Sequence, residues 1–475
     1  MHDFIYTIIS VFRQAVPFAL LGLAAGAVLL VLLGRRKEKR PSKGQVVAVL
    51  LLMCYLGGLV AVTLMSRTED GFRMGVQLHP FLAFFEAWNA FTLRVWLNPL
   101  LNIAMFIPLG VLLPLAAKRF RQWYRSLAAG AGTSLVIEMF QYILGRGQAD
   151  IDDLICNILG AMLGYCLCMS FVSLAGKRRR TAAAYAALPV LSLMTLAGVF
   201  LTYYLQPYGN LEDAPIYAAN TKGVEWVQEC ELSDEPGPSG VYRAEPFTRD
   251  SCDAFAAEFL GRQGAELNSD SDVIYYDNST FYSDHRTYSL MVYYSDRSYE
   301  YMDFRVDSEL RYSDKGGTIT EDELRAALDA RGIDIPDAAT FVVVDKERGR
   351  YAFRAECVVE DGVLTNGEIV CRVAEGGILC DVDNALSVST LYDDAAVISP
   401  REAYERLCAG HFSYQDVPMF DYLALKQVRV TACTLEYMTD SKGFRQPVYS
   451  FTLSDDRDTE LQSGNVWDTF VPALA

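Results

Sequence analysis

Most signatures of well-known chemistry are missing from the sequence. It contains no glycine-rich nucleotide loop, no cysteine or histidine spacing typical of zinc or haem, and no nucleophile elbow or Ser-His-Asp arrangement. Only 4 of the 475 residues are histidine. Basic residues are scarce over residues 207–475, where 23 Lys and Arg stand against 50 Asp and Glu, a net charge of −27. We therefore expect no cofactor and no metal, and the acidic balance disfavours a nucleic-acid partner.

Residues 1–206 have the opposite character, with 19 Lys and Arg against 9 Asp and Glu, a net charge of +10. Six runs in this part are apolar over roughly the 20 residues that a helix needs to cross a bilayer. In lipid such runs must be helices, because no water satisfies the backbone. The expected fold is a polytopic α-helical membrane bundle with spans at about 16–34, 46–65, 99–117, 127–145, 153–175 and 183–205.

Basic clusters follow the first, third and fifth runs, as "RRKEKRPSK", "KRFRQWYR" and "KRRR". The positive-inside rule places these loops in the cytoplasm. Both termini, and everything after residue 206, are then expected outside the membrane. The first run is predicted to be a retained span, because its basic cluster follows the apolar stretch and no small-residue cleavage site is evident.

The region after residue 206 reads as a connector, 207–241, followed by an extracytoplasmic α+β region, 242–475, with two modules of about 242–396 and 397–475. Helices are predicted over 248–261, 320–332 and 399–410, because each opens with Thr or Ser and carries an acid in its first turn. Seven cysteines occur here, an odd number. Cys371 and Cys380 flank a predicted hairpin and are the first pair to test for a disulfide, although free buried thiols remain equally open.

Polar residues interrupt the fourth and fifth runs and the short hinge between them. Given the predicted orientation, these residues and one from the third run lie at one depth near the outer leaflet. Ionisable groups at such a depth are functional candidates by default. We therefore predict a ligand-binding pocket formed by Asn102, Glu138, Gln141, Arg146, Asp150, Asp152, Asp153 and Asn157. No catalytic residue is assigned.

Each of these residues also has a purely structural interpretation. Buried amides such as Asn102 hold helices together by hydrogen bonds. Asp152 or Asp153 could cap the fifth span, and Arg146 is the nearest candidate partner for Glu138. In the third span, Asn98 is placed as the N-cap, Pro99 as the first helical residue and Pro108 as a kink. Gly160 and Gly164 are predicted to form a small-residue packing seam.

Four motifs in order, "VQLHPF", "LNIAMFIPLGVLLPL", "SLVIEMFQ" and "GRGQADIDDLICNILGAMLGY", resemble the VanZ-like family over about residues 46–175. The resemblance implies a multi-pass bacterial cell-envelope protein, and founding members of the family are associated with resistance to teicoplanin and related lipoglycopeptides. The large region after residue 206 is a departure from the simplest members. The signature of the family falls on Asn102, Pro108, Gly110, Glu138, Gln141, Arg146, Asp150, Asp153, Asn157 and Gly160.

Three functions remain open at this point. The first is a non-enzymatic protein that binds a lipid head group, a lipid-linked wall precursor or a lipoglycopeptide at the outward-facing pocket. The second is a membrane-embedded hydrolase or transferase acting on lipid-linked phosphate, with Glu138 and the aspartates holding a divalent metal. The third is an envelope sensor or scaffold whose outer region binds a peptide or protein.

Overall fold

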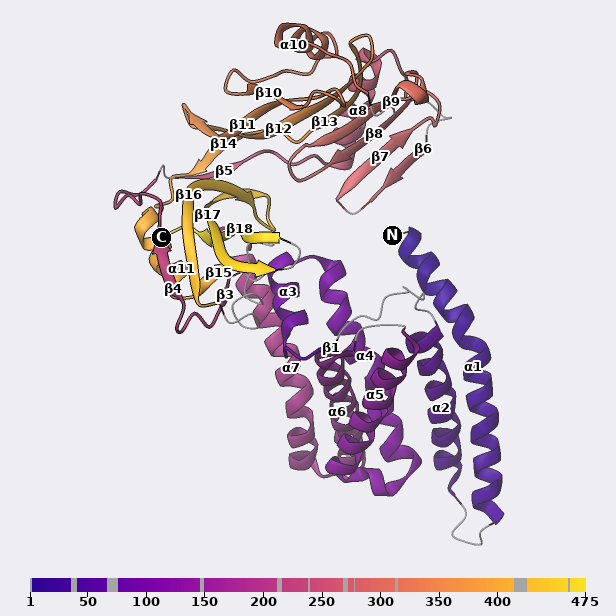
Figure 1. The fold of residues 1–475 in the computed structure, drawn as a ribbon. Helices are drawn as coiled ribbons and strands as arrows, with labels where there is room; N and C mark the ends of the chain where they lie inside the picture. Colours follow the sequence, from indigo (N-terminus) through magenta and orange to yellow (C-terminus); the bar gives the residue numbers. More distant parts are fainter. Residues whose placement is uncertain are drawn as a thin grey trace. The chain divides into compact units, whose positions relative to one another are not determined.

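The computed structural model describes residues 2–35, 41–65, 76–145, 149–211, 216–237, 240–267, 272–276, 278–311, 315–413, 425–459 and 462–475. The chain divides into two compact units, Met1–Pro207 and Tyr208–Ala475. The first unit is helical and the second is rich in β-structure (Figure 1). The two units are described separately.

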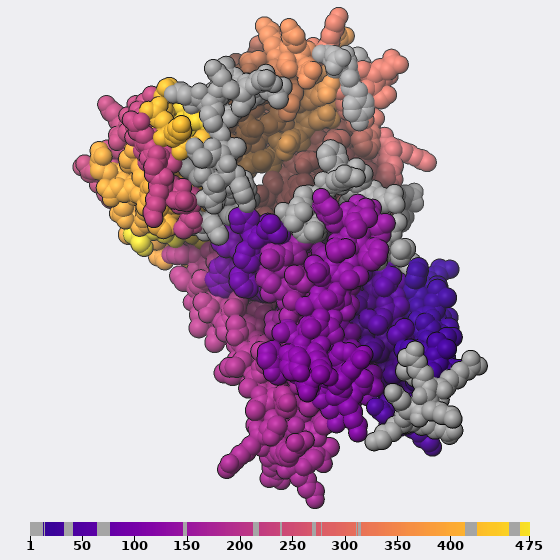
Figure 2. All heavy atoms as spheres, turned by 60° about the horizontal axis from the view of Figure 1, so that its bottom comes forward, coloured from indigo at the N-terminus to yellow at the C-terminus, as the bar shows by residue number. Residues whose placement is uncertain are grey.

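Six helices of the first unit are long and apolar enough to cross a membrane, which confirms the predicted bundle. They are α1 (His2–Arg35), α2 (Lys43–Val60), α4 (Leu93–Ala116), α5 (Trp123–Leu144), α6 (Ile151–Ala175) and α7 (Arg179–Leu205). A π-helical turn, η1 (Ala61–Met65), continues α2, and a 3-10 turn, η2 (Lys118–Arg121), precedes α5. The short helix α3 (Leu82–Ala90) precedes α4. Helix α1 packs along α2 at one side of the bundle (Figure 1, Figure 2).

Helix α4 begins earlier than the sequence suggested. Its N-cap position is Thr92, so Asn98 does not cap it and Pro99 lies inside the helix. Proline has no backbone N–H, so a proline inside a helix removes one hydrogen bond. For this reason proline is most easily accommodated in the first turn of a helix. Apolar helices tolerate an internal proline when neighbouring helices support the backbone. Pro99 and Pro108 are therefore both internal residues of α4.

Helices α4 and α6 cross closely enough to need glycine at the contact. A Cβ atom added to Gly160 or Gly164 would lie 2.0 Å from the carbonyl oxygen of Ile103 or Ile107, respectively. A Cβ atom on Gly110 would lie 1.9 Å from the carbonyl oxygen of Ala161. Close backbone approach through small residues is the usual way in which membrane helices associate. These glycines therefore fix the spacing of the two helices that carry Asn102 and Asn157.

The second unit is built on one large mixed sheet, with fourteen strands among the described residues. The order along its main path is β4-β16-β17-β5-β14-β12-β13-β9-β8-β7-β6, with β10 and β11 branching from β12 and β18 pairing with β17. A separate pair joins β3 to β15. The strands are β3 (Ile216–Ala218), β4 (Glu225–Gln228), β5 (Val241–Arg243), β6 (Asp272–Tyr275), β7 (Ser279–Ser283), β8 (Tyr288–Tyr293), β9 (Tyr299–Asp303), β10 (Thr340–Asp345), β11 (Arg350–Glu360), β12 (Val363–Ala374), β13 (Ile378–Asn384), β14 (Ser387–Asp393), β15 (His411–Ser413), β16 (Gln427–Thr439), β17 (Phe444–Thr459) and β18 (Gln462–Pro472).

The predicted helices of this unit are present as α8 (Arg249–Arg262), α10 (Glu321–Asp329) and α11 (Pro400–Cys408), and a short helix, α9 (Ser308–Arg311), adds a single turn. Thr248, Thr320 and Ser399 are their N-caps, as the sequence indicated. Helices α8 and α10 contribute to one hydrophobic core with β7–β9 and β11–β13, whereas α11 belongs to a second core with β16–β18.

Two details go beyond the sequence analysis. Within the predicted connector, residues 216–218 and 225–228 form β3 and β4, which pair with β15 and β16. Cys371 and Cys380 are both buried free thiols. The strand register explains this, because Cys371 lies opposite Val382 while the thiol of Cys380 contacts the carbonyl oxygen of Arg372 at 3.3 Å. Of the two alternatives that the sequence left open, the structure therefore has the free buried thiols.

Candidate functional site

A polar stripe runs along the inner face of α5. Ser134, Glu138 and Gln141 are spaced at i, i+4 and i+7, so they share one face of the helix. Their exposed fractions are 0%, 7% and 2%. The Gln141 side-chain amide donates to the main-chain oxygen of Thr63 in η1 at 3.0 Å. Membrane-type helices rarely bury such groups without a use for them, so this stripe is the centre of the candidate site.

Helix α6 faces this stripe with Asn157, which is 3% exposed. Its Nδ2 donates to the hydroxyl of Ser134 at 3.0 Å. One turn earlier, Asp153 accepts a hydrogen bond from Asn102 of α4. Polar residues of the third, fourth and fifth predicted spans therefore form hydrogen bonds between the helices, and we refer to these residues together as the polar network.

The hinge between α5 and α6 is also tied to the stripe. A short parallel ladder pairs β1 (Val76–Gln77) with β2 (Ala149–Asp150), which fixes the entry into α6. The main-chain N–H of Asp150 donates to Oε2 of Glu138 at 3.3 Å. The carboxylate of Asp150 accepts from the N–H of Asp152 at 2.8 Å and is the N-cap of α6. The cap is thus Asp150, and neither Asp152 nor Asp153 fills that position.

Asp152 instead caps a different helix. It is 1% exposed, and its two carboxylate oxygens accept from the N–H groups of Phe81, at 2.5 Å, and Ala83, at 2.8 Å. These N–H groups belong to the N-terminus of α3, where Phe81 has a left-handed φ of 70° and supplies no capping side chain. A carboxylate at a helix N-terminus also interacts favourably with the helix dipole. Asp152 therefore holds α3 against α6.

Two buried acceptors in the network have no hydrogen-bond partner among the described residues. They are Oε1 of Gln141 on α5 and Oδ1 of Asn157 on α6. Leaving a buried acceptor unsatisfied costs about 1–3 kcal/mol. Such atoms need an explanation, and one explanation is that a hydrogen-bond donor from outside the protein satisfies them.

The rim of this network is acidic. Burial raises the pKa of Asp150, the hydrogen bond from the Asp152 N–H opposes this, and the charge of Asp152 adds to the rise. The pKa of Glu86 in α3 is likewise raised, first by desolvation and then by Asp150 and Asp152. Sequence reasoning missed Glu86. The available signal was a single acid within the otherwise apolar stretch "LAFFEAWNAF".

Two further features bear on the chemistry of the site. Arg146, a predicted pocket residue, lies outside the described residues. Within the described ranges, no group of three or more His, Cys, Asp or Glu side chains is arranged to hold a metal ion. The carboxylates of Asp150, Asp152 and Asp153 accept instead from helix N–H groups and an amide.

Known proteins that resemble the chain include one family and several solved structures. No curated protein matches the chain. A crystal structure of an uncharacterized protein from Eubacterium rectale ATCC 33656 aligns with a TM-score of 0.30 and 13% identity, covering 55% of this chain and 90% of that one. The VanZ/LLP1 family model matches residues 46–173, the part that contains the polar network and the glycine seam. Residues 46–173 therefore match the VanZ/LLP1 family, as the sequence motifs indicated.

Proposed function

We propose that the VanZ-like domain is a non-enzymatic receptor in the bacterial cell envelope for the polar head of an amphiphile. The candidate ligands are a lipid head group, a lipid-linked wall precursor or a lipoglycopeptide, and binding would contribute to teicoplanin-type resistance. The proposal extends the family match of residues 46–173 by assigning a role to the polar network.

The observation that carries the proposal is the pair of unsatisfied acceptors beside Glu138. Oε1 of Gln141 and Oδ1 of Asn157 are buried and lack partners among the described residues, while the amide nitrogens of the same side chains are bonded. These two oxygen atoms can therefore accept hydrogen bonds from a ligand. Amines and sugar hydroxyls in amphiphile head groups provide the matching donors.

Charge supports an orientation in which this network opens outward. Lys118, Arg119 and Arg121 follow α4, and Arg178–Arg180 follow α6, so both clusters lie at the end of the bundle away from the α5–α6 hinge. With basic residues on the cytoplasmic side, Asp150 and Glu138 face the outer leaflet. A ligand from the outer leaflet would then approach the acidic rim first.

The test uses purified full-length protein and an expressing strain. Glu138→Gln keeps the shape of the side chain and removes its charge, and Gln141→Leu removes one unsatisfied acceptor. We expect both variants to lose lipid that co-purifies with the wild type, measured by mass spectrometry, and to lower resistance to teicoplanin. Thr133→Val is the control, because Thr133 lies on the same helix and bonds only its own helix carbonyl at 2.8 Å in the described structure.

The proposal fails if the two variants retain the co-purified lipid and the teicoplanin susceptibility of the wild type. It also fails if Thr133→Val reduces both quantities to the same extent, because the effect would then be one of general stability. The hydrolase alternative has no specific observation in its favour, since the described aspartates are engaged in capping and amide contacts.

A further inference from the structure

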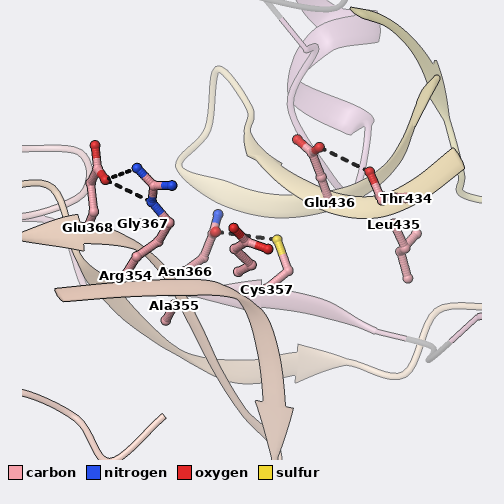
Figure 3. Close-up of a pocket in the computed structure, with 10 residues that line it drawn as sticks. Arg354, Ala355, Cys357, Asn366, Gly367, Glu368, Thr434, Leu435 and Glu436 are labelled. Carbon is pink, nitrogen blue, oxygen red and sulfur yellow. Dashed lines mark hydrogen bonds and ion pairs between the residues drawn. The ribbon is translucent and has the colours of Figure 1, made fainter. Parts of the chain in front are cut away.

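A second candidate site lies in the β-rich unit, independent of the proposal for residues 46–173. It is a pocket of about 730 Å³, within the size range of small-ligand and peptide pockets. Three strands form its walls, with β11 and β12 on one side and β16 on the other (Figure 3). The lining residues are Arg354, Ala355, Glu356, Cys357, Asn366, Gly367, Glu368, Thr434, Leu435 and Glu436.

A β-bulge shapes the first wall. The pairing of β11 with β12 slips between Ala355 and Val358, so Glu356 and Cys357 lie opposite a single partner. Cys357 takes a left-handed φ of 48°, which is unusual for a residue other than glycine. On β12, opposite Ala355, Gly367 has a φ of 106°, and a Cβ atom there would lie 2.2 Å from the carbonyl oxygen of Ala385. Bulges re-aim side chains next to binding sites, and this one turns Glu356 and Cys357 to the pocket.

Two successive contacts connect the first wall of the pocket to the second. The thiol of Cys357 donates to Oδ1 of Asn366 at 3.3 Å, and Nδ2 of Asn366 donates to the main-chain oxygen of Tyr437 in β16 at 3.5 Å. Burial raises the pKa of the Cys357 thiol. The thiol therefore stays protonated at neutral pH and serves as a donor in this contact.

The second wall presents main-chain groups to the pocket. Tyr437 lies opposite Pro447 of β17, and the carbonyl oxygen of Pro447 accepts from the N–H of Ala473 on its other side. Tyr437 is thus in a non-hydrogen-bonded pair, so its N–H and C=O point away from β17 and toward Asn366. Leu435, two residues earlier, has the same orientation by the alternation of an antiparallel ladder. Its N–H and C=O therefore face the pocket.

This edge of β16 has no strand partner at the pocket. In the described part of the chain, β4 pairs with β16 only over Gln427–Val430. On the opposite wall, β10 pairs with β11 no further than Arg354. An unpaired strand edge beside a cavity is the geometry by which an extended peptide adds to a sheet.

The charge of the lining selects the kind of peptide. Nε and Nη2 of Arg354 donate to Oε2 of Glu368 at 2.9 and 2.8 Å, so this arginine is already paired with an acid at one end of the pocket (Figure 3). Glu356 and Glu436 remain as additional negative charges, one on each wall. The lining therefore has one cation and three anions, within a region of net charge −27.

We propose that this pocket binds an extended peptide segment carrying basic side chains. The peptide backbone pairs with Leu435 along the unpaired edge of β16. Lys or Arg side chains on one face of the peptide reach Glu356 and Glu436. This assigns to the β-rich unit the recognition of a basic peptide or of an exposed basic strand of a protein partner.

The test measures fluorescence anisotropy with full-length protein in detergent. The probe is a fluorescein-labelled heptapeptide of alternating Lys and Thr. We expect saturable binding that weakens with added salt, because exposed ion pairs are screened. Glu356→Gln and Glu436→Gln are each expected to weaken binding by up to about fivefold, the range of an exposed ion pair. Alternate N-methylation of the peptide should abolish binding, since it removes the donors that pair with β16.

Two controls make the result specific. Glu375→Gln makes the same charge change in the exposed β12–β13 turn, outside the lining, and should leave binding unchanged. The same heptapeptide with Glu in place of Lys should not bind. Equal binding of the two peptides, an equal loss with Glu375→Gln, full retention after N-methylation, or no binding of the Lys peptide would each overturn the proposal.

Discussion

Replacing Asp152 should release α3 from the bundle without unfolding the membrane helices. The two carboxylate oxygens of Asp152 each accept one N–H from the start of α3, at 2.5 and 2.8 Å, in a site where Asp152 is only 1% exposed. A hydrogen bond to a charged group contributes about 1.5–3 kcal/mol. Asp152→Ala removes two of them, and water entering the site offsets part of the loss, so we expect a local cost of about 3 kcal/mol.

The assay is hydrogen–deuterium exchange of the peptide covering residues 80–92. A local cost of about 3 kcal/mol corresponds to exchange more than about a hundredfold faster, at 1.4 kcal/mol per factor of ten. Asp152→Asn retains one acceptor oxygen and should give an intermediate rate. Exchange in α5 and α7 should stay at the wild-type rate in both variants. If α3 exchanges at the wild-type rate in Asp152→Ala, the capping role assigned to this carboxylate is incorrect.

Three further predictions concern a glycine contact, the pKa of one aspartate and the number of free thiols. Gly160→Ala places a Cβ atom 2.0 Å from the carbonyl oxygen of Ile103 and should lower the thermal unfolding midpoint in detergent. Gly132→Ala is the control and should leave the midpoint unchanged, because no atom lies within 4 Å of its added Cβ. Equal midpoints for the two variants would contradict the close α4–α6 contact. Burial raises the pKa of Asp284. Hydrogen bonds from Thr287 and from neighbouring main-chain N–H groups lower it by more, so the pKa lies below the usual range of an aspartate. Its contribution to stability is therefore present above about pH 4 and lost as the pH falls through the folded-state pKa, and Asp284→Asn should flatten the acid limb of a stability–pH curve. All eleven cysteines are free, so thiol titration of the denatured, unreduced protein should give eleven equivalents, and a lower number would reveal a disulfide.

Local signals in the sequence were sufficient to predict several helices of the structure. Long apolar runs predicted the six membrane-type helices because their length and composition leave few alternatives. Thr248, Thr320 and Ser399 marked helix starts because a hydroxyl that caps a helix acts on N–H groups only two or three residues away. The alternating direction of successive helices was the basis for expecting Asn102, Asp153 and Asn157 at similar depth, and the structure has hydrogen bonds from Asn102 to Asp153 and from Asn157 to Ser134.

Contacts between residues that are distant in the sequence could not be predicted from local signals. Asp152 caps a helix about 70 residues earlier in the chain, so its role depends on how α3 folds back onto α6. The start of α4 was misplaced because Asn98-Pro99 has the local pattern of a helix N-terminus, while packing carries the helix through it. Whether Cys371 and Cys380 form a bridge could not be decided from the sequence because it depends on the strand register, which places Cys371 opposite Val382, two residues beyond Cys380. The role of residues 216–228 depended on β15 and β16, which follow almost 200 residues later.

The pairing of β5 with β14 has a consequence for how the β-rich unit can be divided. Arg243 lies opposite Thr390, so the segment between these two residues begins and ends at adjacent points of the sheet, about 5 Å apart in an antiparallel pair. The core between these points uses residues 252–382, whereas the other core combines residues 219–232 with residues 397–473. The first module is therefore an insertion within a host module whose two halves flank it in sequence. Excising residues 244–389 and closing the gap with a short turn keeps both halves of the host, whereas a cut near residue 396 separates them.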